Sequence, residues 1–158
     1  MRELAVFDID GVVADVRHRL HFLDSRPKDW PGFFAAAGDD PALAEGVALA
    51  RETLASYDLA WLTGRPERLR SVTERWLADA GLPTGPLVMR RHRDFRPARV
   101  AKLEELHRLA GRQTIAMVVD DDPDVVAVLA ANGYPARLAD WVPRPGTLDT
   151  AQEQDGRT

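Results

Sequence analysis

The stretch Leu4-Ala5-Val6-Phe7-Asp8-Ile9-Asp10-Gly11 begins as an apolar run and ends in two acidic residues and a glycine. A short apolar run bounded by a turn residue is typical of a buried strand. We therefore predict a strand over residues 4–9 that leads into a tight turn. The strand would place Asp8 and Asp10 at its carboxyl end.

Strand-like and helix-like segments alternate along the rest of the chain. Further short apolar runs lie at residues 59–62, 87–89, 114–119 and 136–138. Segments with helical periodicity lie at residues 41–56, 66–80, 97–109 and 124–132. Pro41 would be the first helical residue of the earliest helix, with Asp39 or Asp40 as its N-cap. This alternation predicts an α/β fold, with a Rossmann-like parallel sheet and helices on both faces.

Composition limits the classes of protein that the chain fits. Its 158 residues suit one domain, and 45% hydrophobic with 29% charged residues exclude a disordered chain. The absence of cysteine excludes a disulfide scaffold, a thiolate metal site and a catalytic cysteine. Because the net charge is −4, a nucleic-acid substrate would need a local basic patch. No run is long enough for a membrane span, so we expect a soluble, cytoplasmic protein with no membrane partner.

The sequence also suggests how the chain is organised. We expect one domain over residues 1–143, with no large cap domain. The least regular part, residues 12–37, would form a small flap. Residues 144–158 look like a polar C-terminal tail.

Reactive side chains follow three of the predicted strands. Asp8 and Asp10 follow the first, Thr63 the second, and Asp120-Asp121-Asp122 a later one, while Lys102 lies on a predicted helix. Ligands of an open parallel sheet bind at the carboxyl ends of its strands. Two carboxylates about 5 Å apart repel by roughly 3 kcal/mol at an effective dielectric near 20, so this cluster needs cations among its members. Mg²⁺ and the Lys102 ammonium would supply them, which is the composition of a phosphoryl-transfer site.

Each of these residues also has a simpler interpretation. The Asp120-Asp121-Asp122 run precedes Pro123 and would serve as a helix cap. Thr63-Gly64 would serve as an ordinary turn, and Lys102 as a solvated helix lysine.

The order of the motifs carries a family resemblance. Asp8-Ile9-Asp10-Gly11-Val12, Leu62-Thr63-Gly64-Arg65, Lys102 and Val118-Val119-Asp120-Asp121 resemble the four motifs of the haloacid dehalogenase (HAD) superfamily of phosphohydrolases. Longer strings look more narrowly like the 3′-phosphatase domain of phage polynucleotide kinase. They are Asp15-Val16-Arg17-His18-Arg19-Leu20, Pro27-Lys28-Asp29-Trp30, Thr63-Gly64-Arg65-Pro66-Glu67-Arg68 and Asp94-Phe95-Arg96-Pro97.

The resemblance implies a role for each matched residue. Asp8 would be the nucleophile that forms an aspartyl-phosphate, and Asp10 would act as general acid and then base. Thr63 and Lys102 would hold the phosphoryl oxygens. Mg²⁺ would bind Asp8, the backbone carbonyl of Asp10, and Asp120 or Asp121. Asp122 stands where the family more commonly has an arginine.

The resemblance implies a Mg²⁺-dependent phosphomonoester hydrolase, and an open site without a cap suits the 3′ end of a nucleic acid in end repair. The expected substrate-binding residues are Gly64, Arg65, Arg19, Arg91, Arg93 and Arg96. No Gly-x-x-x-x-Gly-Lys-Ser/Thr segment occurs, so this chain has no kinase half. One alternative is a nucleotidase or a broad small-molecule acid phosphatase of the same superfamily. Another is a receiver-like phospho-acceptor domain in signalling. The oligomeric state is left open.

Overall fold

The computed structural model of the protein describes residues 1–158. Its strands form one parallel sheet in the order β3-β2-β1-β4-β5. Their bounds are β1 Leu4–Phe7, β2 Asp58–Pro66, β3 Leu87–Arg90, β4 Ile115–Asp120 and β5 Ala136–Leu138. The predicted α/β parallel sheet is therefore confirmed.

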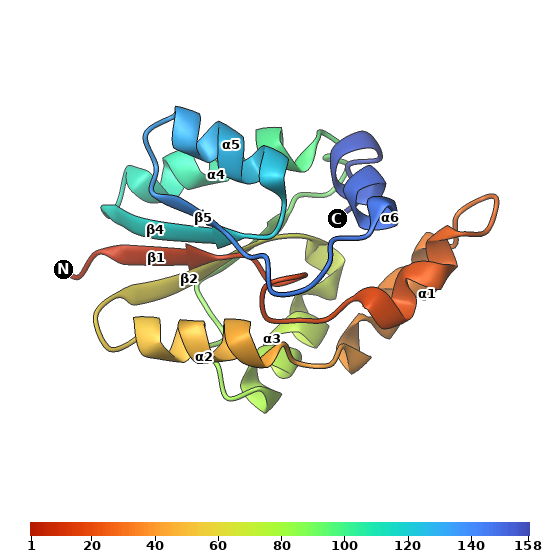
Figure 1. The fold of residues 1–158 in the computed structure, drawn as a ribbon, viewed down its shortest axis with the longest axis horizontal. Helices are drawn as coiled ribbons and strands as arrows, with labels where there is room; N and C mark the ends of the chain where they lie inside the picture. Colours follow the sequence, from red (N-terminus) through yellow and green to blue (C-terminus); the bar gives the residue numbers. More distant parts are fainter.

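Helices cover both faces of the sheet (Figure 1). α4 and α5 lie along one face, and α2 and α3 along the other. Their bounds are α2 Ala44–Thr53, α3 Arg70–Asp79, α4 Ala98–Ala110 and α5 Pro123–Ala131. No helix combines the length and the apolar character that crossing a bilayer requires.

The alternation of side chains along β1 explains why both faces are covered. Leu4 and Val6 belong to a buried cluster that includes Leu106 of α4. Ala5 and Phe7 point the other way, into a cluster that includes Val47 of α2. A strand that is buried on both faces has a continuous run of apolar residues in its sequence, as β1 does.

Several elements differ from the prediction. β1 ends at Phe7, whereas the expected strand ran to Ile9. β2 does not stop at Leu62 but runs through Thr63-Gly64-Arg65 to Pro66, where it pairs with Arg90 of β3. The helix expected from Pro41 begins at Ala44, with Leu43 as its N-cap residue. The Leu43 amide donates to the carbonyl of Val13, so tertiary contact rather than an aspartate side chain sets this helix start.

Short elements beyond the carboxyl end of the sheet complete the fold (Figure 1). The flap region contains the 3₁₀ helix η1, Arg17–Leu23, the helix α1, Trp30–Ala35, and a second 3₁₀ helix, η2, Ala36–Asp39. Residues 144–158, expected as a polar tail, carry α6, Gly146–Asp149, and one π-helical turn, η4, Thr150–Gln154. They pack because Leu148 and Ala151 are buried, Ala151 against Phe33 and Phe34 of the flap.

Candidate active site

The carboxyl edge of the sheet brings Asp8 and Asp120 together. Phe7 pairs in register with Val119, so the next residues of β1 and β4 emerge side by side. Lys102 of α4 reaches the same point, with its Nζ 2.6 Å from Asp120 Oδ2 and 3.1 Å from Asp8 Oδ2. All three side chains are buried, so Lys102 is not a solvated helix lysine.

The aspartates that follow β4 make different contacts. Asp122 accepts a hydrogen bond from the Asp124 amide at 2.9 Å and caps α5, so the capping interpretation holds for this residue. Asp121 instead lies at the carboxyl edge of the sheet, where its carboxylate is against Gly11 and would overlap any Cβ at that position. Arg144 Nη1 lies 3.0 Å from Asp121 Oδ2.

Three carboxylates at this edge suit a hard divalent cation. Asp8, Asp120 and Asp121 each offer one oxygen, and these oxygens all lie within 4.8 Å of one another. Asp121 Oδ1 is buried without a hydrogen-bond donor. Burial and then Asp120 raise the pKa of Asp121 to about 7, and burial raises the pKa of Asp8 well above its ordinary value. An oxygen-ligated cation would relieve both effects, so the residues fit Mg²⁺ chemically.

Asp10 lies in a different electrostatic environment. Its Oδ1 accepts a hydrogen bond from Arg65 Nε at 2.8 Å, and Arg19 Nη2 lies 3.4 Å from the same oxygen. Burial raises the pKa of Asp10, but the two guanidinium groups outweigh burial and leave that pKa below its ordinary value. Its carboxylate is outside the group of three that could hold a cation.

Asp40 is the site residue that the sequence did not reveal. Its carboxylate accepts hydrogen bonds from Arg19 Nε and Arg65 Nη2, both at 2.8 Å, and His18 Nε2 lies 2.6 Å away. The side chains of Asp40, Arg19 and Arg65 are almost fully buried, whereas that of His18 is partly exposed. The Asp39-Asp40-Pro41 string suggested only a helix cap. A local sequence pattern does not indicate that Asp40 would pair with Arg19 and Arg65, which lie far from it in the sequence.

A basic hollow lies next to a smaller cavity that Thr63, Gly64 and Lys102 help to line, and the two share Arg90, Arg91 and Asp94. The basic hollow has a volume of about 100 Å³ and lies between the flap, the end of β2 and the loop after β3. Its lining includes two phenylalanines and five arginines: Phe34, Phe95, Arg68, Arg90, Arg91, Arg93 and Arg157. Glu67 and Asp94 also line it, but Arg70 and Arg96 neutralise them at 2.8 Å.

The expected substrate-binding residues are divided between two places. Arg91 and Arg93 line the hollow. Gly64 lines the smaller cavity, and its carbonyl accepts a hydrogen bond from Arg90 Nε at 3.3 Å. Arg19 and Arg65 lie behind Asp10 instead. Arg96 points away and pairs with Asp94 and Glu104.

The chain matches a known protein family. The family model for the phosphatase domain of polynucleotide kinase PNKP matches residues 2–136. The chain belongs to this HAD-type phosphatase family. No curated protein matches the chain.

Solved structures share the fold of this PNKP-family phosphatase. One chain of the Pnkp1/Rnl/Hen1 complex matches with a TM-score of 0.72 and 22% identity, over 87% of this chain and 46% of that one. The class C acid phosphatase of Bacillus anthracis with tungstate bound matches with a TM-score of 0.62 and 13% identity, over 95% of this chain and 78% of that one. The present chain therefore spans less than half of the Pnkp1/Rnl/Hen1 chain that it matches.

Proposed function

We propose that this phosphatase is a polynucleotide 3′-phosphatase that removes phosphate from nucleic-acid ends during repair. The observation that carries the proposal is the basic hollow, which shares Arg90 and Arg91 with the smaller cavity that Thr63 and Lys102 help to line. Family membership supports it, and the matched Pnkp1/Rnl/Hen1 assembly is described as an RNA repair complex.

The hollow has the chemistry of a short binding site for a nucleic-acid strand. Arg68 lies over the ring of Phe34 at 4.8 Å, and Arg157 lies over Phe95 at 5.0 Å. Phe95 is 54% exposed, so part of this side chain is accessible to a base. Arginines hold phosphates, while aromatic rings stack bases without sequence preference. Arg93 adds a left-handed backbone with φ 61°, a strained conformation that is frequent at functional sites.

The catalytic residues would work in two steps. An oxygen of Asp8 attacks phosphorus, the ester P–O bond breaks, and Asp10 gives its proton to the departing alkoxide. Water then attacks phosphorus, Asp10 takes a proton from it, and the bond to Asp8 breaks to release phosphate. Lys102 and Thr63 stabilise the negative phosphoryl oxygens in both steps. An incoming phosphate dianion offsets Arg65 and Arg19, so it raises the pKa of Asp10 toward the protonated form that the first step needs.

A divalent cation would be held by Asp8, Asp120 and Asp121. When bound, it supplies positive charge that polarises the phosphoryl group and lets neighbouring carboxylates ionise together. Asp120 Oδ2 accepts a hydrogen bond from the Lys102 ammonium, and Asp120 Oδ1 accepts one from the Asp122 amide at 2.9 Å. These contacts fix the orientation of the Asp120 side chain.

A phosphate-release assay on matched esters tests the proposal. If a strand lies in the hollow, kcat/KM is far higher for an oligonucleotide with a 3′-phosphate than for a nucleoside 3′-monophosphate. This advantage shrinks as salt rises, because counterion release drives the added binding. Oligonucleotides with a 5′-phosphate and sugar phosphates complete the comparison.

Arginine variants locate the source of the advantage. Changing Arg91 and Arg93 to alanine should weaken the oligonucleotide and leave a small generic ester almost unaffected. Arg112→Ala is the matched control, since Arg112 is exposed at the opposite, amino-terminal end of β4. Equal efficiency on mononucleotide and oligonucleotide at low salt would overturn the proposal in favour of a nucleotidase or a broad acid phosphatase.

A further inference from the structure

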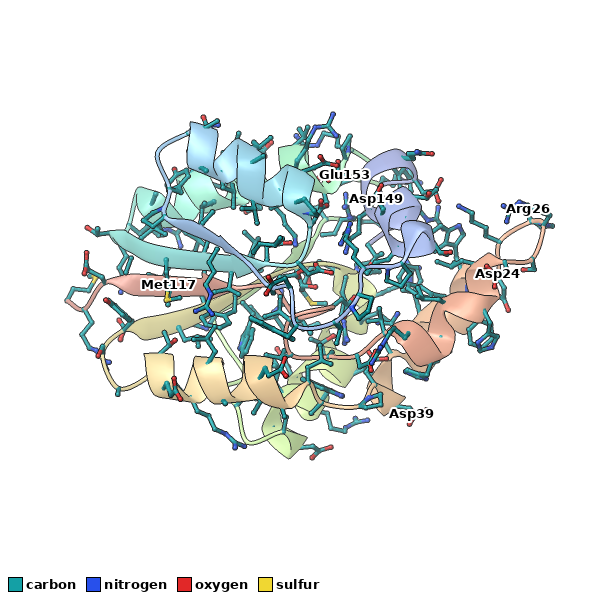
Figure 2. The ribbon with its side chains drawn as sticks, in the orientation of Figure 1. Asp24, Arg26, Asp39, Met117, Asp149 and Glu153 are labelled. Carbon is teal, nitrogen blue, oxygen red and sulfur yellow. The ribbon has the colours of Figure 1, made fainter.

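The C-terminal strap, residues 144–158, crosses the carboxyl edge of the sheet (Figure 1). It begins at Arg144, which contacts Asp121, and continues through α6 and η4. Figure 2 shows Asp149 and Glu153 on this strap, on the side of the sheet that α4 and α5 cover. Glu153 holds Arg99 of α4 at 2.6 Å. The strap is thus fixed to the flap on one side and to α4 on the other.

The last residues of the strap enter the catalytic site. Thr158 is only 2% exposed, and its backbone lies so close to Gly64 that a Cβ there would overlap it. Arg90 Nη2 donates to the Thr158 carbonyl oxygen at 3.1 Å. The Thr158 hydroxyl donates to Asp10 Oδ2 at 3.5 Å. An alcohol oxygen therefore rests on the carboxylate that would serve the ester oxygen of a substrate.

These residues are held by individual side-chain and backbone contacts, among them Arg157 over the rings of Trp30 and Phe95, each at 5.0 Å. Asp155 pairs with Lys28 at 2.5 Å, and the Arg157 amide donates to the Ala151 carbonyl at 3.0 Å. Gly156 has a φ of 59°, and a Cβ on it would overlap the carbonyl oxygen of Phe95. No residue beyond 154 belongs to a strand or a helix. Segments outside helices and strands open locally at a lower cost than the core elements of a fold.

We propose that residues 155–158 form a displaceable plug of the catalytic site. In the closed state, Thr158 occupies the space over Gly64 and Asp10 that the phosphate ester needs. A substrate binds when the plug leaves, so the closed fraction lowers the apparent affinity for every phosphate ester. The inference rests on the phosphatase activity of the site. When the plug leaves, Arg157 leaves the hollow with it, while the other four arginines and both phenylalanines of the hollow remain.

Gly156→Ala is the direct test in the full chain. The added Cβ overlaps the Phe95 carbonyl and disfavours the left-handed backbone, so it releases the plug. We expect kcat/KM for p-nitrophenyl phosphate in the presence of Mg²⁺ to rise. The rise would be about tenfold if the plug occupies the site in about nine of every ten wild-type molecules. Gly146→Ala is the matched control on the same strap, since a Cβ there has no atom within 4 Å, and it should change nothing.

Asp155→Lys tests the same release without touching the backbone. It replaces the ion pair with Lys28 by repulsion between two ammonium groups, and it should raise kcat/KM as Gly156→Ala does. Hydrogen exchange of the Arg157 amide reports the plug directly. Exchange should be faster in both variants, and faster in the wild type with Mg²⁺ and saturating inorganic phosphate than without phosphate.

Two results would overturn the plug. A variant with a rapidly exchanging Arg157 amide but unchanged or lower kcat/KM would show that the strap is a fixed wall of the site. An Arg157 amide that stays protected in both variants, or that phosphate leaves unchanged, would show that these residues do not leave the site.

Discussion

Asp8 and Asp10 are two residues apart, yet their pKa values shift in opposite directions. Burial raises that of Asp8, and the neighbouring carboxylates Asp120 and Asp121 add to the rise. In Asp10, Arg65 and Arg19 overcome burial and lower the pKa. These shifts oppose the proposed first step, in which Asp8 is ionised and Asp10 protonated. A bound cation would lower the pKa of Asp8, and the phosphate of a substrate would raise that of Asp10.

Replacing Asp8 by asparagine tests its assignment as the nucleophile. Asn keeps the shape but removes the attacking charge, so we expect turnover to fall by about 10³-fold or more. The melting temperature should not fall, because the change removes one charge from a crowded acidic cluster. Asp24→Asn, at an exposed flap position (Figure 2), should leave both quantities unchanged. Near-normal phosphate release from folded Asp8→Asn protein would contradict the mechanism.

Asp40 is expected to act as a positioning residue for Arg19 and Arg65. Asp40→Asn leaves both guanidinium groups without their carboxylate partner, so they shift against Asp10, and kcat should fall by about 10²-fold with a smaller change in KM. Asp40→Ala should also destabilise the fold by about 3–5 kcal/mol, as expected when one partner of a buried charge network is removed. Asp39→Asn, at the exposed neighbouring position, is the control. Equal effects at both positions would refute the role.

At the scale of elements, the sequence predicted what local patterns determine. Apolar runs placed all five strands, and the rule for strand ends placed Asp8 and Asp120 near one another. Lys102 was expected to join them from the N-terminal part of a helix. Local patterns failed where distant contacts decide. Thr63-Gly64-Arg65-Pro66 has turn residues but extends β2, because Pro66 pairs with Arg90. Residues 144–158 contain too few apolar residues to predict that Leu148 and Ala151 are buried.

The docking of α4 controls the position of Lys102. Leu106 lies one turn further along the same helix and is completely buried in the cluster with Val6 and Leu62. Leu106→Ala should lower the free energy of unfolding by about 2–5 kcal/mol, measured in urea. Val100→Ala, at a 40% exposed position of α4, should cost far less. If the two variants unfold at the same urea concentration, the helix does not dock through Leu106.

At the scale of the molecule, the net charge of −4 is unevenly spread. Acidic groups concentrate at the ends of β1 and β4, while five arginines line the basic hollow. The field therefore favours a cation at the three carboxylates and an anion such as a phosphate at the hollow. Overall composition gave no sign of this separation, because positive and negative groups cancel in a net charge.

Mg²⁺ should stabilise the whole fold as well as support turnover. A hundredfold excess over the Kd contributes about 2.7 kcal/mol, which for a chain of this size raises Tm by about 5–10 °C. The effect should depend on pH. A carboxyl with a raised pKa stabilises the fold below about pH 4 and loses that contribution as pH rises through its folded value, which for Asp121 is about 7. The metal-free protein should therefore lose stability from this group between about pH 4 and 7.

A bound cation offsets the loss of stability that ionisation of Asp121 causes. At low pH Asp121 is protonated, so the cation must displace that proton in order to bind. Calorimetry should consequently give a larger Mg²⁺-induced rise in Tm at pH 8 than at pH 5.5. Asp121→Asn removes the titrating group, so it should flatten this pH dependence and weaken the response to Mg²⁺. A chelator that changes neither Tm nor the rate of phosphate release would show that the three carboxylates hold no catalytic cation.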